Sequence, residues 1–170
     1  MTPTLYWING PWAGRLAISA RPRGGDWLEE EVAGWRESGV NAVASLLTPD
    51  EVEGLGLGEE ARLSQKEGIT FMSFPIPDRG VPASREKALD FLRQMEAGLA
   101  QGRNAAIHCR QGVGRSALIA AGLLVLGGAD PEQAFELLSK LRGCSLPETA
   151  EQRKWVEQFA KDAVPARLTG

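Results

Sequence analysis

The stretch AAIHCRQGVGRSALIAAGLLVLGGA, residues 105–129, decides the architecture of the chain. It begins with a short apolar run, continues through a turn that contains two glycines, and ends in a longer apolar segment. This order predicts a buried strand over 105–108, a turn over 109–115 and a buried core helix from residue 116 onward. Ligands of open α/β sheets bind at the carboxyl ends of the strands, so we expect this turn to be the functional site.

Short apolar runs alternate with helix signals along the rest of the chain. Four further runs are expected to form strands: residues 5–8, 16–18, 40–47 and 69–75. Capping patterns predict helix starts at five positions: Asp26, Thr48, Ser84, Asp130 and Ser145. The pattern therefore predicts an α/β fold. We expect one three-layer domain over residues 1–170, with a central, largely parallel sheet of about four or five strands flanked by helices.

Composition narrows the classes of function. The chain has 170 residues and a formal net charge of −3, a mild acidity that argues against a nucleic-acid-binding protein. Its two cysteines form no disulfide framework, which indicates a reducing compartment. The first residues lack the basic region and apolar core of a signal peptide, and no apolar run reaches the ~20 residues of a membrane-spanning helix. We expect a cytoplasmic monomer that binds neither membrane nor nucleic acid.

Few residues of the chain can bind a transition metal. The histidine and cysteine side chains are those of His108, Cys109 and Cys144, and the first two point to opposite faces of the predicted strand. A zinc site needs three or four such ligands around one centre, so we predict no metal and no cofactor. The opposite orientation also argues against a Cys–His catalytic pair, and the turn lacks the first glycine and the lysine of a Walker A loop.

The turn fits a site for an anion with a thiol at its base. Backbone amides and the positive end of a helix dipole attract an anion, and Gly112 and Gly114 permit a close backbone approach. Arg115 lies six positions after Cys109 and can return its planar guanidinium to hold two phosphate oxygens. The same positive field favours the thiolate form of Cys109, and Ser116 can donate a hydrogen bond to the sulfur. The residues predicted to bind phosphate are Arg110, Gln111, Gly112, Val113, Gly114 and Arg115.

The residues HCRQGVGRS, 108–116, resemble the HCx5R[ST] signature of the cysteine-dependent protein tyrosine phosphatases, and the GxGRS ending is similar to the dual-specificity branch. PDRGVP, residues 77–82, matches the PDxxxP pattern of the family's acid loop, which implies that Asp78 is the general acid. PETAEQ, residues 147–152, resembles a P-x-T-x-x-Q helix start of the family, which implies that Gln152 orients water. GRLAISARPRGGDW, residues 14–27, is similar to kinase-associated phosphatase relatives and their bacterial homologues.

The resemblance implies a metal-independent phosphomonoester hydrolase that acts through a cysteinyl-phosphate intermediate, with Cys109, Arg115, Asp78, Ser116 and Gln152 as catalytic residues. The implied substrate is a protein that carries phosphotyrosine. Phosphoserine, phosphothreonine, phosphoinositides and other phosphomonoesters stay open, because the choice depends on pocket depth.

Two other hypotheses remain beside the phosphatase. A rhodanese-like or arsenate-reductase-type thiol enzyme has a similar loop but does not need Asp78. A pseudophosphatase binds phosphoproteins without turnover, and the joint presence of Cys109, Arg115 and Asp78 argues against it. A disulfide between Cys109 and Cys144 also stays open.

Overall fold

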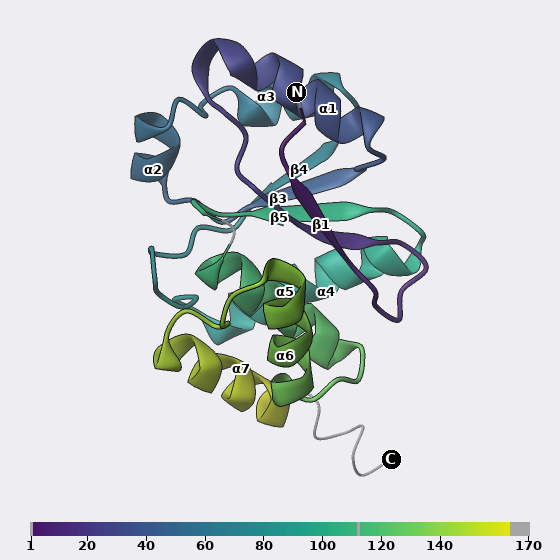
Figure 1. The fold of residues 1–170 in the computed structure, drawn as a ribbon, viewed down its shortest axis with the longest axis vertical. Helices are drawn as coiled ribbons and strands as arrows, with labels where there is room; N and C mark the ends of the chain where they lie inside the picture. Colours follow the sequence, from purple (N-terminus) through teal and green to yellow (C-terminus); the bar gives the residue numbers. More distant parts are fainter. Residues whose placement is uncertain (1, 112, 164–170) are drawn as a thin grey trace.

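Five short apolar segments form one mixed sheet at the centre of the molecule (Figure 1). The computed structural model describes residues 2–111 and 113–163. The strands are β1 (Leu5–Ile8), β2 (Leu16–Ser19), β3 (Ala42–Ser45), β4 (Thr70–Ser73) and β5 (Ala105–His108). They lie in the order β1-β2-β5-β3-β4, in which β1 pairs antiparallel with β2 and the other neighbours pair in parallel. The predicted α/β fold with a largely parallel sheet is confirmed.

Helices cover both faces of the sheet, which gives the three layers (Figure 1). On one side lie the 3-10 turn η1 (Gly25–Trp27) and the helices α1 (Leu28–Glu37), α2 (Pro49–Gly54) and α3 (Glu60–Lys66). On the other side lie α4 (Arg85–Ala100), α5 (Gly114–Leu126), α6 (Pro131–Arg142) and α7 (Ala150–Ala163). Each layer has its own buried apolar cluster against the sheet. Helical crossovers of this kind explain why neighbouring strands run in parallel.

Strand β5 and helix α5 form the centre of the fold. β5 lies between β2 and β3, and all of its residues are buried. Helix α5 is buried along its whole length, because α4, α6 and α7 all pack against it. It begins at Gly114, two residues before the predicted start, so Arg115 lies in its first turn. Within residues 2–111 and 113–163, no helix is both long and apolar enough to cross a bilayer.

Three of the five predicted helix starts are confirmed by side chains that accept a backbone hydrogen bond at the N-cap: Thr48, Ser84 and Asp130. The start at Asp26 is wrong, because the chain forms η1 there and α1 follows without a side-chain cap. The start at Ser145 is also wrong. Thr149 and Gln152 exchange the capping-box hydrogen bonds instead, at 3.1 and 3.2 Å, so α7 begins after Thr149.

Candidate active site

Cys109 directly follows β5 and lies at the base of the turn into α5. Its side chain is buried, and Ser116 Oγ donates a hydrogen bond to Cys109 Sγ at 3.1 Å. Ser116 is in the first turn of α5, so the thiol faces the N-terminal end of that helix. A hydroxyl donor and the positive end of a helix dipole therefore lie beside one sulfur atom.

Arg115 directs its guanidinium back across the same turn, and its side chain is only 2% exposed. Nη1 donates to Glu51 Oε1 at 2.7 Å and to the carbonyl oxygen of Ile76 at 2.8 Å. Nη2 donates to Glu51 Oε2 at 2.9 Å and lies 3.4 Å from Asp78 Oδ1. The segments that follow β3 and β4 thus fix the orientation of an arginine that belongs to α5.

Glu51 is a site residue that the sequence reasoning missed. It is the third residue of α2, where its carboxylate accepts a hydrogen bond from the Thr48 backbone N–H at 3.1 Å and also binds both Nη atoms of Arg115. The hydrogen bond from Arg115 is the largest cause that lowers the pKa of Glu51 from 4.5 to about 2, against the opposing effect of burial. A signal was available: the capping box follows β3, whose carboxyl end shares an edge with that of β5.

Asp78 lies in the loop between β4 and α4, in agreement with the loop position that the PDxxxP pattern implied. The loop turns tightly, with Gly80 N–H bonded to the carbonyl oxygen of Pro77 at 2.8 Å and Arg79 at a φ of 60°. The Asp78 carboxylate is 60% exposed, and its Oδ1 lies 3.4 Å from Arg115 Nη2. The structure therefore brings Asp78 to the turn that contains Cys109 and leaves its carboxylate accessible to solvent.

Gln152, in the first turn of α7, is fully buried, although it was expected to orient water. Its Oε1 accepts from the Thr149 backbone N–H, and its Nε2 donates to the carbonyl oxygen of Gly80 at 3.2 Å. Both ends of the amide are therefore bonded to protein. Gln152 connects the start of α7 to the Asp78 loop.

The His108 side chain points to the face of the sheet that α1 and α3 cover, whereas Cys109 packs on the other face. Its Nε2 lies 2.6 Å from Glu60 Oε2, and its ring stacks on Trp35 with 5.7 Å between centroids. Both members of the His108–Glu60 pair are buried. The sequence reasoning missed Glu60, because 48 residues separate it from His108 and no local pattern marks it.

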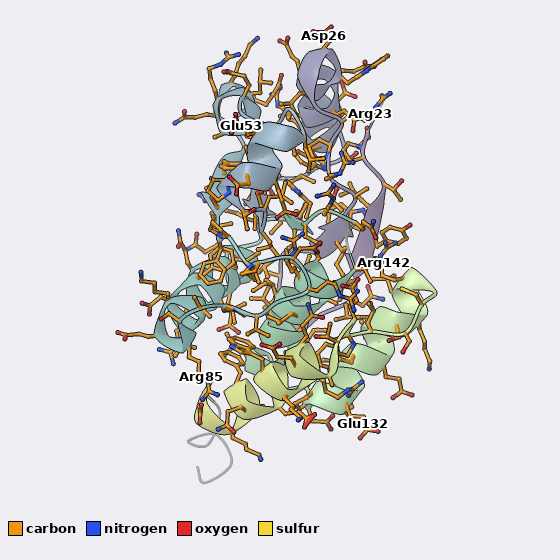
Figure 2. The ribbon with its side chains drawn as sticks, turned by 90° about the vertical axis from the view of Figure 1, so that its left-hand side faces the viewer. Arg23, Asp26, Glu53, Arg85, Glu132 and Arg142 are labelled. Carbon is orange, nitrogen blue, oxygen red and sulfur yellow. The ribbon has the colours of Figure 1, made fainter. Side chains whose placement is uncertain are left out.

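The remaining loop residues form the rim. Arg110 is half exposed with its Nη1 3.9 Å from Glu51 Oε2, and Gln111 accepts a hydrogen bond from Arg142, labelled in Figure 2, at 3.4 Å through its carbonyl oxygen. Val113 occupies the N-cap position of α5 without a side-chain hydrogen bond, Gly114 begins the helix, and Gly112 lies outside the described residues.

The described part of the chain contains no group of three or more His, Cys, Asp and Glu side chains arranged to hold a metal ion. Cys109 and Cys144 are both free thiols, the second of them exposed. The site thus combines a thiol, a fixed guanidinium and an accessible carboxylic acid. These are the groups needed for displacement at a phosphorus centre.

Known proteins resemble this chain in sequence and in structure. A family model described as a DSP-PTPase phosphatase of a polymorphic toxin system matches residues 19–129. Cyclin-dependent kinase inhibitor 3 of Homo sapiens is 28% identical over 144 residues, which cover 84% of this chain and 67% of that protein.

Two solved structures have the same arrangement of strands and helices. Kinase associated phosphatase, with a serine in place of its catalytic-site cysteine, matches with a TM-score of 0.87 at 23% identity, over 97% of this chain and 98% of that one. Tk-PTP in its active form matches with a TM-score of 0.75 at 27% identity, over 94% and 97% of the two chains.

Proposed function

The chain belongs to the DSP-PTPase family of protein-tyrosine and dual-specificity phosphatases, and we propose that it hydrolyses phosphomonoesters of proteins through a cysteinyl-phosphate intermediate. One observation carries the proposal. Arg115, which follows the Cys109 turn, lies 3.4 Å from the Asp78 carboxylate, so nucleophile, phosphate ligand and acid occupy one edge of the sheet. Cys109 and Arg115 belong to one continuous motif, and the contact with Asp78, 31 positions before Cys109, supports the assignment of the acid to the same site.

In the first step, the Cys109 thiolate attacks the phosphorus atom of the ester. An S–P bond forms and the P–O bond to the leaving group breaks, with the electron pair moving to the leaving oxygen. Asp78 gives its proton to that oxygen. Arg115 and the backbone amides of the turn, residues 110–114, are proposed to stabilise the negative charge on the remaining phosphate oxygens.

In the second step, water attacks the phosphorus atom of the cysteinyl phosphate. Asp78, now ionised, takes a proton from the water, the S–P bond breaks and inorganic phosphate leaves. The Ser116 hydroxyl, 3.1 Å from Cys109 Sγ, stabilises the sulfur as it departs with the electron pair. The chemistry proposed for these residues needs no redox step, and the proposal invokes no cofactor.

The proposed substrate is a phosphorylated protein, with phosphotyrosine as the first candidate and phosphoserine or phosphothreonine as the second. The signature turn carries no lysine, which disfavours a phosphoinositide with several phosphate groups. We further propose that residues 1–170 act as one catalytic domain and as a monomer. The two free thiols support a reducing, cytoplasmic location.

The test is hydrolysis of phenyl phosphate in the presence of a chelator. We expect turnover by the wild type, no turnover by Cys109→Ser, and a rate lower by about 10²–10⁴ for Asp78→Ala with an intact fold. An inactive wild type or an active Cys109→Ser variant would contradict the proposal. Sulfur transfer or arsenate reduction that survives Asp78→Ala would favour the rhodanese-like or arsenate-reductase-type alternative instead.

A further inference from the structure

The segment 148–152, at the start of α7, contacts the Asp78 loop twice. Glu148 Oε1 lies 3.3 Å from Arg79 Nη1, and Gln152 Nε2 donates to the carbonyl oxygen of Gly80 at 3.2 Å. Arg79 and Gly80 are the two residues that follow Asp78. We call residues 148–152 the anchor segment. The anchor segment therefore contacts the loop at the Arg79 side chain and at the Gly80 carbonyl oxygen, in the two residues that follow Asp78.

The loop itself needs such support. Arg79 has a φ of 60°, in the left-handed region that a residue with a Cβ adopts at a cost and keeps only when its surroundings impose it. The Asp78 side chain is 60% exposed, so packing does little to fix its position. Beside the ion pair between Asp78 and Arg115, contacts made by the two residues that follow Asp78 are then the interactions that can orient the acid.

The anchor segment also abuts the signature turn. A Cβ added to Gly114, the first residue of α5, would lie 3.0 Å from Gln152 Nε2 and 3.1 Å from the Cβ of Glu148. These distances are tighter than ordinary van der Waals contact. The anchor segment therefore lies against both the start of α5 and the Asp78 loop.

We propose that Glu148 and Gln152 are positioning residues that orient Asp78 for proton transfer, Glu148 through Arg79 and Gln152 through Gly80. This inference rests on the proposed function, because it takes Asp78 to be the general acid. It also gives Gln152 a different task from the orientation of water, since both ends of its amide are bonded to protein.

The first readout is the dependence on the leaving group. Phenyl phosphate releases a phenol similar to that of tyrosine, with a pKa of about 10, which needs a proton as it leaves. Dinitrophenolate leaves without one. The kcat/KM value reports the steps up to release of this first product, so it isolates the transfer from Asp78.

Against phenyl phosphate, we expect kcat/KM to fall about twofold to fivefold in Glu148→Ala, the effect of one exposed ion pair. In Gln152→Ala, which loses a buried hydrogen bond, we expect a fall of about threefold to tenfold. Against dinitrophenyl phosphate, both variants should match the wild type. Equal losses on both substrates, or no loss on phenyl phosphate, would overturn the inference.

The second readout is coupling to Asp78. In an Asp78→Asn background, Glu148→Ala should cause no further loss, because the acid that it positions is already gone. Exchanging the charges, Arg79→Glu with Glu148→Arg, should restore most of the activity lost in Glu148→Ala. A loss that persists in the Asp78→Asn background and is not rescued by the exchange would mean that Glu148 acts independently of Asp78 and Arg79, and would overturn the inference.

A matched control lies on the other side of the sheet (Figure 1). Arg36 of α1 and Glu67, which follows α3, form an ion pair of 3.4 Å with side chains 66% and 24% exposed. In the Arg79–Glu148 pair the two atoms are 3.3 Å apart, and the side chains are 64% and 27% exposed. Glu67→Ala therefore breaks an equivalent pair, and it should change kcat/KM for neither ester.

Failure of the inference can be told apart from failure of the proposed function. An inactive wild type, or an active Cys109→Ser variant, refutes the phosphatase mechanism. A wild type that depends on Cys109 and Asp78 but is insensitive to Glu148→Ala and Gln152→Ala refutes the anchor segment alone.

Discussion

Replacing Glu51 with glutamine tests the electrostatic centre of the site. The Glu51 carboxylate binds both Nη atoms of Arg115, at 2.7 and 2.9 Å, and is 10% exposed. Glu51→Gln keeps the size of the side chain and one acceptor oxygen but removes the negative charge. Arg115, with its side chain 2% exposed, then keeps its hydrogen bond to the Ile76 carbonyl oxygen and its 3.4 Å contact with the exposed Asp78 carboxylate, but it loses the charge of its buried, bidentate partner.

The expected loss of stability follows from the pKa of Glu51. This pKa falls from 4.5 to about 2 in the folded protein, chiefly because of the hydrogen bond from Arg115. At about 1.4 kcal/mol for each pKa unit, the ionised carboxylate contributes about 3 kcal/mol to the free energy of unfolding. Because the folded pKa is the lower one, this contribution is complete above about pH 4.5 and is lost as the pH falls toward 2.

The assay is urea unfolding of the wild type and Glu51→Gln at neutral pH and at steps down to about pH 3. The other ionisable groups are shared, so the difference between the two proteins isolates Glu51. We expect Glu51→Gln to be about 3 kcal/mol less stable at neutral pH, with a difference that shrinks as the pH falls. A difference that is independent of pH, or below about 1 kcal/mol at neutral pH, would refute the reasoning.

Three further predictions concern single contacts. Ser116→Ala removes the hydrogen bond to Cys109 Sγ, so hydrolysis of the intermediate should slow about threefold to tenfold, seen as a lower steady-state rate after an undiminished burst of first product. An unchanged steady-state rate would contradict this role. Glu60→Ala leaves His108 Nε2 buried without its hydrogen-bond partner and should cost about 1–3 kcal/mol in urea unfolding, and a cost below about 0.5 kcal/mol would show that the pair is not structurally important. Thr149→Ala removes the N-cap of α7 and should cost about 1 kcal/mol in the same assay, whereas no change would place the helix start elsewhere.

The fold was predictable where the signal is local. Each strand is a short apolar run between polar segments. Four of the observed strands lie within the predicted runs, and β2 extends one residue beyond its run. The caps at Thr48 and Asp130 were predictable because the donor and acceptor lie three residues apart. The start of α7 was misplaced for the same reason: Ser145 and Thr149 begin two consecutive capping patterns, residues 145–148 and 149–152, and the sequence does not say which one the fold uses.

The candidate site was predictable only in part, because some of its contacts cross the fold. The signature turn and the Asp78 pattern are continuous in sequence and were found. Glu51 and Glu60 bind residues that are 64 and 48 positions away, and a carboxylate looks the same in sequence whether it faces solvent or an arginine. Only the register of β3 beside β5 brings Glu51 to Arg115. The second bond of Gln152, to Gly80, likewise depends on how α7 packs.

The most direct test of the account is a search for phosphate on Cys109. The wild type is mixed with a phosphotyrosine peptide, quenched in acid within the first turnover and analysed by mass spectrometry of its peptides. The account predicts one phosphoryl group bound to Cys109, a greater yield of it in Asp78→Ala at times when its first step has gone to completion, and none in Cys109→Ser. Turnover of the peptide by the wild type with no phosphoryl group on Cys109 in either protein, or turnover by Cys109→Ser, would contradict it.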